Sequence, residues 1–214
     1  MMSRRPGRSC LVPLVLAMLY ASSADAQVGR NMGVLNPNTA TETEMAALPH
    51  MNGAKASSIV EGRPFRNMLE IHALVGASLT EEQQDELYSR LFLPLNLNDT
   101  AEEEIHLVPG VGRRMAHEFD EYKPYAGLPV FRREIGKYVD DEEVARLEQF
   151  VFVPIDLNTA SDGDILSIPG MGRRMLREFK EYRPYRQIEE FRREIGKYVD
   201  DDEVARLERY VSID

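Results

Sequence analysis

Apolar residues recur along this chain in short clusters at helical spacing. The clearest cluster comprises Met175, Leu176, Phe179 and Tyr182, which fall on one side of an α-helix. This helix must end before Pro184, because the residue that precedes a proline is disfavoured in the helical region. Comparable clusters elsewhere in the chain predict an all-α fold built from short helices.

The clusters belong to a unit of sixty residues that occurs three times in succession. Its markers are Asn38, Asn98 and Asn158, each followed by a proline at position 49, 109 or 169. Such self-similarity predicts three tandem units of about four short helices each, over 35–94, 95–154 and 155–214. The apolar junctions 91–94 and 150–154 predict extended, packed connections, since flexible linkers are polar and rich in glycine and serine.

Each unit opens with a pattern that is typical of a helix start. In 39–42, 99–102 and 159–162 an N-cap residue precedes a carboxylate by three positions, which is the spacing of a capping box or its aspartate variant. Asp200, three residues before Glu203, predicts a further N-cap. Gly136 and Gly196 predict the C′ position that glycine commonly fills after a helix.

The N-terminus has the layout of a secretory signal peptide. Basic residues, an apolar run over 11–19 and small residues up to Ala26 predict a cleaved leader over 1–26, followed by a loose tail over 27–34. No apolar run is long enough to cross a bilayer, so we expect a secreted or periplasmic protein with no stable membrane span after cleavage. Cys10 is the only cysteine and lies in this leader, so we expect no disulfide and no cysteine ligand in the mature chain.

Charge is distributed unevenly. The chain has a formal net charge of −10, and the leader contributes three arginines and one aspartate, so the remainder carries −12. This sum opposes nucleic-acid binding, which needs clustered cations. Residues 173–193, however, contain eight Arg or Lys against four Glu, a local +4. The third unit is therefore predicted to have a basic side, and the acid to gather elsewhere.

The most informative motif is Pro-Gly-x-Gly-Arg-Arg, found at 109–114 (the second hairpin) and 169–174 (the third hairpin). Glycines allow a tight turn with positive φ, and a glycine at a helix start leaves backbone N–H groups open to an anion. The arginines then follow on the first helical turn, where they can make charge-assisted contacts with phosphates. Arg177 extends this basic face of the third unit.

The first copy of the motif, 49–54 (the first hairpin), lacks these features. His50 and Asn52 replace the two glycines, and Gly53 and Ala54 replace the two arginines. This unit is predicted to have a packing or capping role.

The stretch 157–179, LNTASDGDILSIPGMGRRMLREF, resembles the helix-hairpin-helix module, and most closely its secreted, ComEA-like form. The resemblance covers nearly the whole chain after the leader and implies non-sequence-specific binding of double-stranded DNA, with DNA uptake as a possible process. By position it implies phosphate binding at Gly110, Gly112, Arg113 and Arg114 and at Gly170, Gly172, Arg173 and Arg174. The chain departs from the family at 194–199, where a partner hairpin is expected but only one glycine occurs and acidic residues follow.

Catalysis is not expected. His50, His72, His106 and His117 show no metal-ligand spacing, and no nucleophile or nucleotide-binding motif occurs, so neither metal nor cofactor is predicted. The competing interpretation is a non-catalytic scaffold of an envelope complex, which meets protein partners through the acidic surface. The Arg-Pro-Tyr stop at 183–185 favours it, because it resembles the small extrinsic subunit of photosystem II, a structural helix-hairpin-helix protein.

Overall fold

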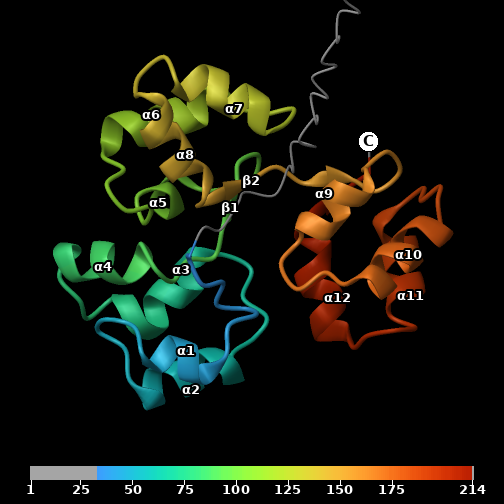
Figure 1. Ribbon diagram of the computed structural model, residues 1–214, viewed down its shortest axis with the longest axis horizontal. Coiled ribbons are helices and arrows are strands. Elements are labelled where there is room, and N and C mark those ends of the chain that lie inside the picture. Colours follow the sequence, from blue (N-terminus) through green and yellow to red (C-terminus); the bar gives the residue numbers. More distant parts are fainter. Residues whose placement is uncertain (1–32, 214) are drawn as a thin grey trace, which may run out of the picture.

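The computed structural model describes residues 33–213, so the predicted leader and most of the predicted tail lie outside the described residues. Helices dominate this part of the chain (Figure 1). In the first repeat they are α1 (Glu42–Ala46), α2 (Gly53–Glu61), α3 (Met68–Ile71), the π-helical η1 (His72–Gly76) and α4 (Glu81–Tyr88). The second repeat contains α5 (Glu102–Ile105), α6 (Arg113–Glu121), α7 (Leu128–Ile135) and α8 (Asp141–Glu148). The third contains α9 (Asp162–Ser167), α10 (Arg173–Glu181), α11 (Ile188–Ile195) and α12 (Asp201–Glu208).

The fold is predominantly helical but not purely so. Strand β1 (Leu95–Asn96) pairs in parallel with β2 (Val151–Phe152), and β3 (Ile155–Asp156) pairs in parallel with β4 (Val211–Ser212). A parallel bridge joins Leu35 to Leu91 in the same way. The sequence predicted extended, packed junctions correctly, but it did not predict their pairing, because segments of two residues show no strand periodicity. The predicted loose tail is wrong at its end, since Val34 is buried.

The helix starts differ from the predicted capping boxes by two residues. The N-caps are Thr41, which accepts from the backbone N–H of Glu44, and Ser161, which accepts from that of Asp164. Helix α5 follows Ala101 and has no side-chain cap. The residues predicted as caps instead lie in a turn, where the carbonyl of residue 36, 96 or 156 accepts from two following N–H groups. Asp200 does cap α12, as predicted.

Gly136 and Gly196 occupy the C-cap rather than a left-handed C′ position. Their φ values are −61° and −60°. A Cβ atom at Gly196 would lie 2.8 Å from the carbonyl oxygen of Arg192, so the close approach of backbone explains the glycine there.

The marker asparagines connect the start of each repeat to the segment that follows its second helix. Asn98 accepts from the backbone N–H of Tyr125 at 2.7 Å and donates to the carbonyl of the same residue at 2.9 Å. Asn38 binds Phe65 and Asn158 binds Tyr185 with the same pair of bonds. In each case the bonded residue follows a cis X-Pro peptide. These bonds fix the second helix of each hairpin relative to the start of its repeat.

Two hydrophobic cores organise residues 33–213. One runs continuously through the first and second repeats, from Val34 to Val153, and the other combines Phe152 with residues of the third repeat from Ile155 to Val211. In Figure 1, α1 to α8 accordingly lie together on the left, with α9 to α12 on the right. None of the helices within 33–213 is long and apolar enough to cross a membrane.

Candidate functional site

The first glycine of each intact hairpin is needed by the backbone. Gly110 and Gly170 connect α5 to α6 and α9 to α10 with φ values of +74° and +78°. His50 has the corresponding conformation in the first repeat, with φ at +60°. A side chain in this left-handed region costs about 1 kcal/mol or more, which is why glycine suits the turn.

A buried arginine supports the turn from below. A Cβ atom at Gly170 would lie 3.3 Å from Nη2 of Arg206, whose guanidinium is bound by Glu203 and donates to the carbonyl of Pro169. Arg146 lies at the same distance from Gly110 and is held by Glu143 in the same way.

The first repeat replaces this support by a different pair. Glu86 stands sixty residues before Arg146, and its Oε2 lies 2.9 Å from Nε2 of His50. The glycine–arginine contact of the second and third repeats is thus replaced in the first by a histidine–glutamate contact. The sequence could have shown this, because positions 50 and 86 change together between the repeats.

The second glycine is not needed by the chain itself. Gly112 and Gly172 are the N-caps of α6 and α10, with φ values of −84° and −108°, and no side chain caps either helix. A Cβ atom at either glycine would meet no atom within 4 Å. In the first repeat, by contrast, Asn52 caps α2 by accepting from the N–H of Lys55 at 2.9 Å. The N-termini of α6 and α10 are therefore left open where that of α2 is closed.

The predicted arginines are exposed at these open N-termini. Arg113, Arg114, Arg173 and Arg174 form the first turns of α6 and α10, and Arg177 follows on α10. The structure thus brings each glycine pair together with its arginine pair, as the sequence predicted. No ion pair within 33–213 involves any of these five side chains.

A tyrosine from the turn after α7 or α11 lies beside the second arginine of each pair. The guanidinium of Arg114 is 5.9 Å from the ring centre of Tyr138, and that of Arg174 is 6.0 Å from Tyr198. Hydrogen bonds with Tyr122 and Glu118 raise the pKa of Tyr138 above its usual range. Tyr138 and Tyr198 were not predicted as site residues, although both stand at the same repeat position, where the first repeat has Ser78.

A small recess opens beside the second hairpin. Its volume is about 220 Å³, and its walls come from Gly112, Arg114, Met115, Glu118 and Tyr138. Glu118 is buried, and its Oε2 atom has no hydrogen-bond partner among the described residues. A buried carboxylate disfavours an anion inside the recess, so a phosphate is better accommodated at the exposed rim formed by Gly112 and the arginines.

Helix-hairpin-helix proteins are expected to have a partner hairpin at the turn between α11 and α12. Here the lysine of that turn is already ion-paired. Lys197 is paired with Glu194, which also accepts from Arg193 at 2.9 Å. The hydrogen bond from Lys197, and to a smaller extent that from Arg193, holds the pKa of Glu194 below its usual range. The equivalent Lys137 and Glu134 are paired alike. Because the acidic first turn of α12 lies next to it, this turn is a poor binding site for phosphate.

The third hairpin differs from the second in its surroundings. The position of a Cβ atom at Gly170 is 3.5 Å from Cγ2 of Thr39, a residue of the first repeat, whereas only Arg146 approaches Gly110. The inner side of the third hairpin thus faces the first repeat, while Gly172 and its arginines remain exposed.

Within 33–213, no three His, Cys, Asp or Glu side chains are grouped so that they could hold a metal ion. No protein-family model, no curated protein and no solved structure matches this chain.

Proposed function

We propose that this chain is a secreted or periplasmic protein that binds the phosphate backbone of double-stranded DNA without sequence preference. The second and third hairpins are the binding elements, and the first is a packing element. In this proposal the three repeats are tandem helix-hairpin-helix units of the ComEA-like type, with ranges 35–94, 95–154 and 155–214. DNA uptake is a process that such a protein could serve.

The observation that carries the proposal is the contrast between the three helix starts. Asn52 closes the N-terminus of α2 with its own side chain, while Gly112 and Gly172 leave those of α6 and α10 open. Neither glycine is required by φ or by packing. A residue without a side chain at an exposed, uncapped helix start is explained by the close approach of an anionic partner to the backbone amides.

The arginines are placed to reinforce that contact. They are exposed and occupy the first turn after the open N-cap, where guanidinium groups can reach neighbouring phosphates on either side. Such contacts carry no base information, so the proposed binding is independent of sequence.

The two hairpins are not equal. Position 177 is arginine in the third repeat, but its counterpart in the second is His117, whose Nε2 lies 3.8 Å from Glu121. Position 180 is a lysine that pairs with Asp162, whereas its counterpart is the acidic Asp120. We therefore expect the third hairpin to bind phosphate more tightly than the second.

The test is binding of the protein to a random-sequence duplex, followed by fluorescence anisotropy. Arg173→Ala/Arg174→Ala should weaken binding by about tenfold or more, since a hydrogen bond to a charged group contributes about 1.5–3 kcal/mol. Arg113→Ala/Arg114→Ala should have a smaller effect in the same direction.

Arg90→Ala is the charge control, because Arg90 is exposed and lies just after α4 in the first repeat. It removes one positive charge away from both hairpins and should leave affinity nearly unchanged. Losses that simply follow the number of charges removed, with Arg90→Ala losing about half as much binding free energy as each double variant, would indicate general charge attraction and would contradict a hairpin site.

The alternative function is a non-catalytic scaffold of an envelope complex. The net charge of −10 and the acidic first turns of α8 and α12 favour it, because they offer an anionic surface to protein partners. Absence of any duplex binding at low salt would favour the scaffold over the DNA-binding protein.

A further inference from the structure

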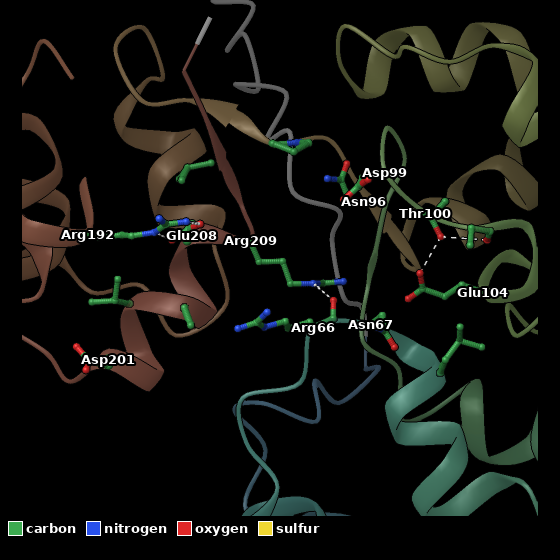
Figure 2. A pocket seen from close by; sticks show the side chains of 16 residues that line it. Arg66, Asn67, Asn96, Asp99, Thr100, Glu104, Arg192, Asp201, Glu208 and Arg209 are labelled. Atoms are coloured by element: carbon green, nitrogen blue, oxygen red, sulfur yellow. Dashed lines mark hydrogen bonds and ion pairs between the residues drawn. The ribbon is translucent and has the colours of Figure 1, made fainter. Parts of the chain in front are cut away.

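The third repeat takes one core residue from the second, Phe152 of β2, whose ring centre lies 4.7 Å from that of Tyr210. Its core is otherwise built from its own residues and is distinct from the one that the first and second repeats share. A cavity of about 780 Å³ opens where the three repeats meet, and it is lined mainly by polar and charged residues (Figure 2). A shared core fixes the second repeat on the first, whereas the third is joined to them by Phe152 and by polar contacts.

Among residues 33–213, the shortest hydrogen bonds across this junction come from one side chain. Arg209, the C-cap of α12, donates from Nε to the carbonyl oxygen of Arg66 at 2.7 Å and from Nη2 to that of Pro94. Figure 2 shows it reaching from the third repeat to the backbone at Arg66. Its guanidinium also lies 5.0 Å from the ring centre of Phe152 and 5.5 Å from that of Tyr210.

The partners of Arg209 belong to fixed parts of the fold. Arg66 precedes α3, whose first N–H group, on Met68, donates at 2.6 Å to the buried carboxylate of Glu104 in the second repeat. The segment 66–68 is therefore held by the second repeat on one side and by the third on the other. Apart from Arg209, Asn36 bonds to the Tyr210 hydroxyl at 3.3 Å, which is a long bond.

The repeat itself shows that Arg209 is not needed by its own helix. The C-cap of α8 at the equivalent position is Gln149, and that of α4 is Ser89. An arginine at the third of these positions alone, bonded to residues more than a hundred positions away, serves the junction and not the helix end.

We propose that Arg209 is a positioning residue that fixes the third repeat against the other two and so sets the spacing between the second and third hairpins. This inference rests on the proposed function, because a fixed spacing matters when both hairpins grip one duplex. Linking two weak sites at the right distance raises affinity without any new contact, and a loose junction loses that gain.

The junction is tested by distances between spin labels at Glu121→Cys and Glu181→Cys, in a Cys10→Ser background. These exposed residues end α6 and α10. Arg209→Gln should broaden the distance distribution, while circular dichroism stays unchanged because α8 already tolerates glutamine. Arg90→Gln removes the same charge elsewhere and should leave the distribution as it is.

Duplex binding is then measured for Arg209→Gln with both hairpins intact and in the Arg113→Ala/Arg114→Ala background. The loss should be about tenfold when both hairpins are present and less than about twofold when one is disabled, since only linked sites gain from fixed spacing. An unchanged distance distribution overturns the positioning role of Arg209. Equal losses in both backgrounds overturn its role in spacing. If the native protein binds no duplex, the proposed function itself fails, and the role of Arg209 in binding fails with it.

Discussion

At the scale of single residues, repeated side chains act mainly on backbone groups. Asn98 satisfies both the N–H and the carbonyl of Tyr125, which is buried and lies 27 positions away. Arg206 holds the carbonyl of Pro169. These bonds close loops that have no regular secondary structure, and a buried backbone group without a partner costs free energy.

Asn98→Ala should lower the free energy of unfolding by about 2 kcal/mol, because it leaves two backbone groups of Tyr125 without their partner. Asn98→Asp keeps the acceptor but loses the donor, so it should destabilise as well at neutral pH. Chemical denaturation followed by circular dichroism measures both. Asp99→Ala, an exposed neighbour, is the control and should change stability by less than about 0.5 kcal/mol. A loss no larger than that of the control would contradict this role for Asn98.

At the scale of helices and turns, the decisive difference between the repeats lies at one position, the N-cap after the hairpin. Asparagine fills it in the first repeat and glycine in the other two. Both satisfy the helix geometry, but only the glycine leaves the first N–H groups open.

Gly172→Asn should therefore separate stability from binding. The new side chain meets no atom at Cβ and can accept from the third residue of α10, as Asn52 accepts from Lys55. Unfolding free energy should stay the same or rise by a few tenths of a kcal/mol. Duplex affinity should fall by about tenfold, because the cap occupies an amide that the phosphate needs.

Asn52→Gly is the reciprocal control. It opens the N-terminus of α2, where Gly53 and Ala54 follow instead of arginines, so it should not add affinity. Unchanged binding by Gly172→Asn would refute the use of the open N-terminus.

The sequence predicted the helices and the hairpin glycines well, because both depend on local spacing. It placed the capping boxes two residues early, since Thr159 with Asp162 and Ser161 with Asp164 have the same spacing. The choice between them depends on the turn that Asp156 begins, which local patterns do not reveal. Local patterns also could not predict the bond between Asn98 and Tyr125 or the bonds of Arg209, because both join segments that are distant in the sequence.

At the scale of the whole molecule, an acidic protein is expected to bind DNA only where its cations gather. The net charge of −10 opposes a phosphate surface everywhere except at exposed arginines with no acidic partner. Two hairpins that engage about two to four phosphates should give a log–log salt slope of about −2 to −4. A slope near zero would mean that phosphates are not bound.

The second hairpin has fewer cations than the third, so adding one there should change the salt slope. His117 stands where the third repeat has Arg177, so His117→Arg adds the missing cation to α6. We expect duplex affinity to rise and the salt slope to become more negative by about 0.9, the value for one additional phosphate contact. Ser89→Arg adds the same charge at the end of α4, in the repeat whose hairpin has no arginines, and should change the slope much less. Binding isotherms at four or more salt concentrations measure both variants. If the two variants steepen the slope equally, the protein attracts DNA by overall charge, and α6 has no part in holding it.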